Sequence, residues 1–168
     1  TCSDEDIAAA TAAMRAFVAT IMDEKVPAQG WEFAPEKKNE GLLAASKVQY
    51  VLQGYNFKKL GYEWSGKMRV LNQILSRDWL NNQIRVIGGA YGGYSQIQPS
   101  GDILFASYRD PNLSETLDNY KKTVDYLRSF TADDEAMTRF IIGTIARMDQ
   151  PLTPSQKGNA AVRYYFEK

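Results

Sequence analysis

Hydrophobic side chains first recur at helical spacing near the N-terminal end of the chain. Ser3 and the acidic residues that follow it are typical of a helix start, because a serine oxygen can accept hydrogen bonds from free amides and a helix N-terminus favours negative charge. The apolar stripe that follows consists of Ile7, Ala10, Met14, Phe17, Val18 and Ile21. One helix with an apolar face is therefore predicted at this end of the chain.

The helical periodicity is lost after residue 23. The next stretch contains Pro27, Gly30 and Pro35 and ends in a run of charged residues, a composition that is typical of a surface linker. The chain is therefore predicted to consist of three parts: a helical segment at 1–23, a linker at 24–41 and a domain at 42–168.

A strand and two helices are predicted at the start of this domain. Residues 46–55 favour a strand, because apolar and polar side chains alternate there: Val48, Tyr50 and Leu52 against Lys47, Gln49 and Gln53. Helical spacing returns in two groups: Trp64, Met68, Leu71 and Leu75 up to about Ser76, then Trp79, Leu80, Ile84 and Val86. The second helix carries Arg85 at its end, where two glycines stop it.

A hairpin and three helices complete the pattern. Pro99-Ser100-Gly101 separates two predicted strands, at 91–98 and 102–108. Asn112 or Ser114 is expected to cap the next helix, whose inward face would consist of Leu113, Leu117, Tyr120, Val124 and Leu127. The second helix starts in 131–135 and is expected to point Met137, Ile141, Ile145 and Met148 inward. Thr153, Pro154 and Gln156 predict a capping box for a helix that runs to the chain end. The sum predicts an α+β fold with antiparallel pairing rather than alternating βαβ units.

Composition and charge exclude several classes of protein. The 168 residues suffice for one domain, or for one domain with a piece of a neighbour, and 44% of them are hydrophobic. Twenty basic residues balance twenty acidic ones, so nucleic acid is not an expected partner. No apolar run approaches the roughly 20 residues of a membrane span, and no signal peptide is visible. A cytoplasmic setting is the default expectation, although a segment of a longer protein would lack any targeting sequence.

A metal site is not expected in this chain. It has no histidine, and its single cysteine, Cys2, can form neither an internal disulfide nor a thiolate zinc site. The acidic run Asp133-Asp134-Glu135 is better explained as the first turn of a helix than as a metal cluster. We predict no catalytic residue and no metal ligand in this segment.

The most specific stretch lies between residues 85 and 111. Residues 85–91 have the sequence Arg-Val-Ile-Gly-Gly-Ala-Tyr, and the hairpin that follows ends in Ser107-Tyr108-Arg109-Asp110-Pro111. Taken alone, an arginine before a glycine turn indicates a surface or structural ion pair. The glycine-rich run lacks the Gly-Lys-Ser/Thr of a phosphate loop and leads into a strand. Asp110 is expected to cap and Arg109 to pair locally.

These two motifs, together with residues 141–145 and the later Pro151, resemble the C-terminal domain of zinc metallopeptidases of the insulinase (pitrilysin) family, in the presequence-protease branch. The resemblance covers almost the whole chain and implies helices packed on one face of a mainly antiparallel sheet. It implies that residues 1–23 are the last helix of a preceding domain. It also implies that 42–168 is a truncated C-terminal domain, which in the family continues with at least one more helix and strand. The family's zinc site, with its His-x-x-Glu-His signature, would lie in an N-terminal domain.

The resemblance also implies roles for four residues. Arg85 and Tyr91 would hold the substrate backbone from the half of the enzyme that does not carry the zinc, because a guanidinium and a phenol donate hydrogen bonds to peptide carbonyls. Gly88 and Gly89 would let the chain turn sharply and approach the peptide closely. The implied function is the noncatalytic C-terminal part of a zinc peptidase that degrades unstructured peptides. Its expected partners are the peptide and the remaining domains of the parent chain, in the bacterial cytoplasm or an organelle matrix.

Two other kinds of function remain open at this point. Homologous domains also serve as inactive structural subunits, but such a subunit would have no use for the Arg85 and Tyr91 donor pair. A free-standing peptide-binding module of this size is the second, although residues 1–23 would then form a helix without a partner.

Overall fold

The computed structural model describes residues 3–21, 27, 30, 36 and 38–166. Most of the predicted linker, Cys2 and the last two residues of the chain lie outside this described part. By its contacts the chain divides into two units. Leu43–Gln150 is one of them and contains the sheet, and the segments on either side of it form the other.

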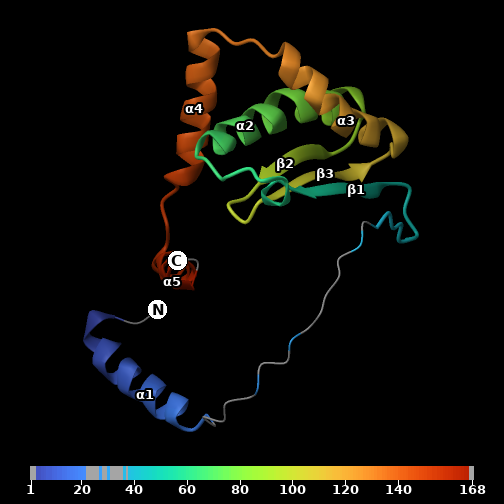
Figure 1. Ribbon diagram of the computed structural model, residues 1–168. Helices are drawn as coiled ribbons and strands as arrows, with labels where there is room; N and C mark the ends of the chain where they lie inside the picture. The colour runs from blue at the N-terminus through green and yellow to red at the C-terminus, as the bar shows by residue number, and fades with distance from the viewer. Residues whose placement is uncertain (1–2, 22–26, 28–29, 31–35, 37, 167–168) are drawn as a thin grey trace. The chain divides into compact units, whose positions relative to one another are not determined.

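The sheet is antiparallel and has three strands in the described residues (Figure 1). They are β1 (Gln49–Asn56), β2 (Gly92–Ile97) and β3 (Asp102–Asp110), in the order β1-β3-β2. The predicted hairpin is confirmed, since β2 and β3 pair directly around the turn, where Gly101 N–H donates to the carbonyl of Gln98 at 3.0 Å. The α+β class predicted from the sequence is therefore correct. Because β3 is central, β2 and β1 are the two edges of the described sheet.

One continuous helical rod replaces the two helices predicted between residues 64 and 87. Helix α2 (Lys67–Ile74) runs without a break into η3 (Leu75–Ile87), which is wound as a π-helix with hydrogen bonds from residue i to i+5. The prediction of a break near Ser76 was wrong, because no glycine or proline interrupts 67–87. The glycine stop after Arg85 is confirmed, since the helix ends at Ile87 and Gly88 is its cap.

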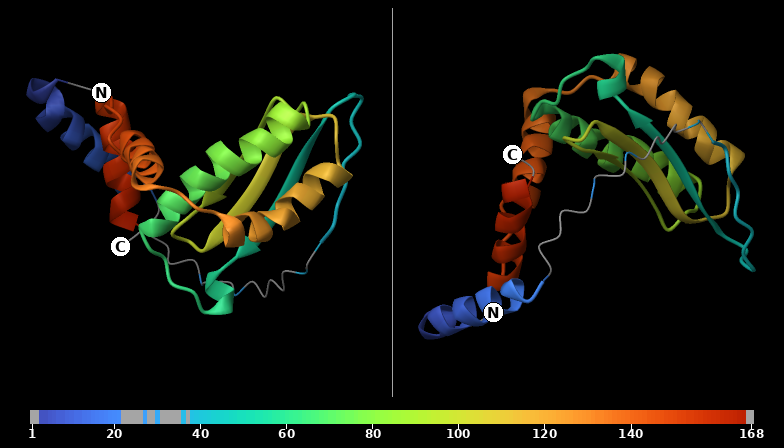
Figure 2. Two further views of the ribbon diagram at one scale, coloured as in Figure 1. Left: turned by 90° about the horizontal axis from the view of Figure 1, so that it is seen from above. Right: turned by 60° about the horizontal axis from the view of Figure 1, so that its bottom comes forward.

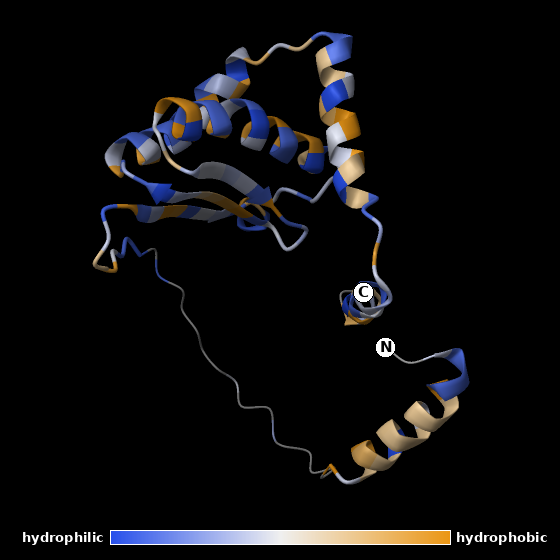
Figure 3. Cartoon of the chain, turned by 180° about the vertical axis from the view of Figure 1, so that it is seen from behind, coloured by the Kyte–Doolittle hydropathy of each residue, from blue (hydrophilic) through white to orange (hydrophobic). Residues whose placement is uncertain are grey.

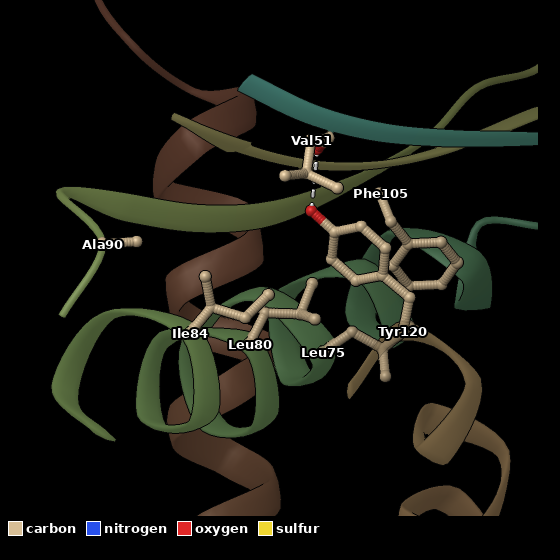
Figure 4. Close-up of a cluster of buried hydrophobic side chains, with 7 residues drawn as sticks. All are labelled: Val51, Leu75, Leu80, Ile84, Ala90, Phe105 and Tyr120. Atoms are coloured by element: carbon tan, nitrogen blue, oxygen red, sulfur yellow. Dashed lines mark hydrogen bonds between the residues drawn. The ribbon is translucent and has the colours of Figure 1, made fainter. Parts of the chain in front are cut away.

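The helical rod and α3 (Ser114–Ser129) lie over the same face of the sheet, as the view from above shows (Figure 2, left). Between them and the strands is a core of buried side chains (Figure 4): Val51, Leu75, Leu80, Ile84, Ala90, Phe105 and Tyr120. The hydroxyl of Tyr120 donates to the carbonyl of Val51 at 2.9 Å, which joins α3 to strand β1. Burial of this apolar set is the main source of stability of the unit.

The alternating apolar residues of β1 do not form its buried face. Val51 is buried against the helices, whereas Tyr50 and Leu52 are exposed on the other side of the sheet. Leu52 lies in register with Ala106 of β3, which is in turn opposite Tyr94 of β2. The described sheet therefore has an open face with apolar and aromatic side chains.

Some predicted inward positions of the later helices were wrong. On α3 the buried residues are Thr116, Tyr120 and Thr123, and Val124 is exposed. Helix α4 (Asp134–Met148) buries only Thr144. Three residues of α4 that were predicted to point inward are exposed: Ile141, Ile145 and Met148. Leu113 and Val86 are also exposed. Helices α3 and α4 therefore bury fewer of their apolar side chains than the helical spacing of these residues predicts.

The helix starts were predicted unevenly. Asp133 caps α4, since its carboxylate accepts from Ala136 N at 2.7 Å. The capping box of α5 (Pro154–Phe166) is also confirmed, with Gln156 N donating to Thr153 Oγ1 at 3.3 Å and Thr153 N to Gln156 Oε1 at 2.9 Å. The predictions for Ser3 and for Asn112 or Ser114 were wrong. Leu113 takes the cap position of α3 without a side-chain bond, and the Ser3 hydroxyl donates to Asp6 instead of accepting from an amide.

Helix α1 (Ile7–Ala19) confirms the first predicted element, and a short 3-10 turn (Asp4–Asp6) precedes it. Its ribbon is coloured mainly on the hydrophobic side of the scale (Figure 3). The large apolar side chains of the predicted stripe are all at least half exposed: Ile7, Met14, Phe17 and Val18 on the helix and Ile21 just after it. Among the described residues, no helix is long and apolar enough to cross a membrane.

The buried tyrosine of the core gives a pH-dependent prediction. Burial raises the pKa of Tyr120 to about 12, and the nearby Asp110 carboxylate adds to the increase. The unfolded chain ionises this phenol near its ordinary pKa of 10, so Tyr120 contributes stability that is complete below pH 10 and is lost as the pH rises through about 12. Denaturant unfolding between pH 9 and pH 12 should show this decrease, and the Tyr120→Phe variant should show a shallower one. Equal slopes for the two proteins would contradict the prediction.

Candidate functional site

The turn between η3 and β2 needs glycine at two positions for different reasons. Gly89 has a φ of 76°, which side-chain-bearing residues rarely adopt. Gly88 has an ordinary φ, but a Cβ added there would lie 2.7 Å from the carbonyl oxygen of Ile84. Together the two glycines let the chain leave the helix after Ile87 and enter β2 just after Tyr91.

Tyr91 is 60% exposed and is held from one side by the end of β3. Its ring lies 5.2 Å from the ring of Tyr108, and the Arg109 guanidinium carbon lies 5.6 Å from its centroid. Arg109 has a φ of 48°, a left-handed conformation that is uncommon for arginine, at an irregular point of the β1–β3 pairing. The expected local ion pair of Arg109 is absent from the described residues, and its cation contacts the aromatic ring instead.

A buried carboxylate fixes the end of β3 behind this turn. Asp110 is fully buried and accepts hydrogen bonds from Ser107 Oγ at 2.5 Å, Thr116 Oγ1 at 2.7 Å and Asn112 N at 2.9 Å. The Asn112 side chain donates to the carbonyl of Gly88 at 2.6 Å. The glycine turn is therefore tied through Asn112 to the Asp110 network. Asp110 has a structural role as expected, but it does not cap α3, whose cap position is Leu113 without a side-chain bond.

Arg85 and Tyr91 line the same open pocket, which has a volume of about 390 Å³. Three arginines and three tyrosines contribute to its wall: Arg77, Arg85, Arg147, Tyr91, Tyr94 and Tyr108. Gly88 and Gly89 are not part of the wall and shape the turn beside it. The pocket thus combines three fixed positive charges with phenolic hydroxyls that can donate hydrogen bonds.

None of the described residues that line this pocket is acidic. The ion pairs found in the described part of the chain involve other cations, namely Lys38, Lys121, Arg128 and Arg139. Arg77, Arg85 and Arg147 therefore have no acidic partner in that part. Their charges remain available to an anionic or carbonyl-bearing ligand.

Sequence reasoning singled out Arg85 and Tyr91 but not the other two arginines that line this pocket. Arg77, Asn81 and Arg85 follow one another at four-residue intervals, so they lie along one side of η3 and could have been grouped by spacing. Arg147 comes from the end of α4, more than 60 residues later, and no local pattern connects it with this turn. Its place in the pocket follows only from the fold.

Residues 39–168 match the protein family described as the PreP C-terminal domain. The chain belongs to this family. The glycine turn with Arg85 and Tyr91 and the whole sheet lie within the matched residues.

The chain is also similar to several curated proteins. It is 47% identical over 136 residues to protein HypA of Clostridium perfringens, which covers 81% of this chain and 14% of that protein. It is 39% identical over 133 residues to the chloroplastic and mitochondrial presequence protease 1 of Arabidopsis thaliana, covering 79% of this chain and 12% of that protein. The mitochondrial presequence protease of Mus musculus is 34% identical over 91 residues, which are 54% of this chain and 9% of that protein. The chain thus spans about one eighth of the length of the first two relatives.

The residues of this chain do not fit a zinc site of the kind expected for a metallopeptidase. The sequence has no histidine, and the described residues contain no group of three or more histidine, cysteine or acidic side chains that could hold a metal ion. A catalytic zinc usually has three protein ligands and one open position for water. No step of the function proposed below therefore uses a metal held by this chain.

Proposed function

We propose that this chain is the noncatalytic C-terminal part of a zinc-dependent peptidase that degrades unstructured peptides, and that it holds the substrate backbone opposite the zinc site. The observation that carries the proposal is the pocket beside the glycine turn, where Arg85 and Tyr91 come together. Arginine donates only and cannot act as an acceptor, and the neutral phenol of tyrosine donates well. The pair is therefore suited to binding carbonyl oxygens.

The chemistry fits substrates of varied sequence. Every residue of an extended peptide offers a carbonyl acceptor, so donors aimed at the backbone bind without reading side chains. Gly88 and Gly89 add no side chain beside the pocket, which leaves room for a peptide backbone to approach the turn. The packing of Tyr91 on Tyr108 and Arg109 orients its ring in advance, which lowers the entropy lost on binding.

The position of β2 supports an additional mode of binding. It is an edge strand of the described sheet and begins directly after Tyr91. An extended peptide can add to such an edge by main-chain hydrogen bonds. A substrate held by Arg85 and Tyr91 would then continue along β2 as an extra strand.

The rest of the parent protein would supply the zinc, its ligands and the catalytic base. In this proposal residues 1–23 close a preceding domain, 24–41 connect the two and 42–168 form the substrate-binding domain. The match to the PreP C-terminal domain, which begins at residue 39, supports this division. The exposed apolar stripe of α1 and the open apolar face of the sheet support contacts with further domains of the parent.

The parent is proposed to act in the bacterial cytoplasm, with an organelle matrix as the other candidate compartment. The relatives from Arabidopsis thaliana and Mus musculus are named as chloroplastic or mitochondrial proteins. The relative from Clostridium perfringens supports a bacterial setting.

The proposal is tested on the full-length parent protein with a Tyr91→Phe variant. The parent is expected to contain zinc and to cleave an unfolded peptide in a way that a chelator abolishes. Tyr91→Phe removes the hydroxyl but keeps the ring that packs on Tyr108. It should lower kcat/KM about 3- to 10-fold, because one hydrogen bond contributes roughly 1 kcal/mol, and should leave the zinc content unchanged.

Tyr55→Phe is the matched control, because Tyr55 is an exposed tyrosine on β1 that does not line the pocket. It should cleave at the wild-type rate. A parent that neither holds zinc nor cleaves peptides would instead favour an inactive structural subunit. Unchanged turnover by Tyr91→Phe would remove the tyrosine from the proposed site.

A further inference from the structure

Two positive charges of the pocket have no role in backbone binding as proposed above. Arg77 lies on η3 eight residues before Arg85, and Arg147 lies near the end of α4. Both line the pocket together with Tyr91, and neither has an acidic partner among the described residues. Elements far apart in the sequence thus bring unpaired guanidiniums to one place.

Such a concentration of like charges is unfavourable unless an anion neutralises it. Guanidinium groups repel one another, and most exposed arginines of the described chain avoid this by pairing locally or by contacting an aromatic ring. Arg128 pairs with Asp125 and Arg139 with Glu135, each within one helical turn. Arg69 lies over the ring of Trp64. The pocket arginines have none of these compensations, so a bound carboxylate would relieve their repulsion as well as form charge-assisted hydrogen bonds.

We propose that Arg77 and Arg147 form a carboxylate subsite that makes the peptidase prefer substrates with a carboxylate next to the backbone segment held by Arg85 and Tyr91. Arginine suits this ligand, because its planar fork matches the two oxygens of a carboxylate. The hydroxyls of Tyr94 and Tyr108, which also line the pocket, can donate to the same oxygens. The carboxylate comes either from an acidic side chain or from the C-terminal end of the peptide, and both have the same chemistry.

This inference rests on the proposed function, because it names the substrate class of the same pocket. Backbone binding and carboxylate binding nevertheless depend on different residues. Tyr91→Phe tests the first without removing a charge. Arg77→Gln together with Arg147→Gln tests the second without touching the backbone donors.

The test uses the full-length parent and four unfolded peptides of one sequence. One peptide carries a glutamate and a free C-terminus, one has glutamine in place of the glutamate, one has an amidated C-terminus, and one has both changes. The kcat/KM of the wild-type protein should fall about 10-fold on removal of the recognised carboxylate, which identifies its source. In the Arg77→Gln/Arg147→Gln variant the four values should become equal within about 2-fold. The wild-type preference should also weaken as salt screens the charges.

Arg139→Gln is the matched control, because Arg139 lies on α4 like Arg147 but does not line the pocket. It should keep the wild-type preference.

The inference is overturned if wild-type protein cleaves all four peptides equally, or if the double variant keeps the preference. If this happens while Tyr91→Phe lowers cleavage of all four, the backbone-holding function stands alone. If Tyr91→Phe has no effect but the preference depends on Arg77 and Arg147, the carboxylate subsite stands and Tyr91 is removed from the backbone-binding site. No cleavage of any of the four peptides would overturn both.

Discussion

Replacing Arg85 by alanine in the full-length parent protein is expected to lower kcat/KM for an unfolded peptide about 10- to 100-fold. A charge-assisted hydrogen bond contributes roughly 1.5 to 3 kcal/mol, and each 1.4 kcal/mol corresponds to a factor of ten. Because the substitution removes a donor on the wall of the pocket and not a metal ligand, the zinc content of the parent should not change. Steady-state kinetics and metal analysis of the same preparation measure both quantities.

Two further variants show whether the guanidinium itself is responsible. Arg85→Lys keeps the charge but loses the fork, so it should recover only part of the lost activity. Arg128→Ala removes an exposed arginine of α3 that pairs with Asp125 away from the pocket, and it should behave like the wild-type protein. Full turnover by Arg85→Ala would contradict the assignment of Arg85. A loss of the same size in Arg128→Ala would indicate a general effect of charge.

Local chemistry was predictable from the sequence where one short segment determines the outcome. The hairpin turn at Pro99-Ser100-Gly101, the Asp133 cap and the capping box around Thr153 each depend on a few neighbouring residues, and each is present. The same holds for the glycine stop after Arg85. These features need no knowledge of which surfaces become buried.

Burial could not be predicted with the same success, because a stripe of apolar residues does not say what covers it. Tyr50 and Leu52 of β1 have the spacing of a buried face, yet Val51 between them is the residue that enters the core. Ile145 and Met148 of α4 are likewise exposed. Two of its relatives are much longer than this chain, and under the proposed function such surfaces would contact other domains of the parent protein.

The candidate site was predictable only where its residues are close together in the sequence. Arg85 and Tyr91 lie six residues apart around one turn, so their proximity follows from the local sequence. Arg147 reaches the pocket only because α4 packs beside α2, a contact between helices separated by the whole sheet hairpin and α3. Because the sequence did not group Arg77 and Arg147 with Arg85, the family resemblance implied backbone binding alone, whereas the assembled pocket also suggests an anion.

Replacing Asp110 by alanine is expected to destabilise the sheet unit by about 3 to 5 kcal/mol. The carboxylate is fully buried and accepts three hydrogen bonds, from Ser107, Thr116 and the backbone N–H of Asn112. Removing it leaves buried donors without acceptors, which costs more than the bonds themselves contribute. Asp110→Asn keeps the shape but offers one acceptor fewer and two N–H donors, so it should lose about 1 to 3 kcal/mol.

Denaturant unfolding of the chain measures this loss, and Asp118→Ala provides the control, because Asp118 is an exposed carboxylate of α3 paired with Lys121. The free energy of unfolding of Asp118→Ala should stay within about 0.5 kcal/mol of the wild-type value.

The consequence for the site follows from Asn112, whose side chain donates to the Gly88 carbonyl and whose backbone N–H donates to Asp110. Once the carboxylate is gone, the turn that sets Arg85 beside Tyr91 loses its anchor. Asp110 variants that remain folded should therefore also have a lower kcat/KM in the full-length parent protein. An Asp110→Ala chain that unfolds at the same denaturant concentration as the wild-type chain would show that the network is not structural.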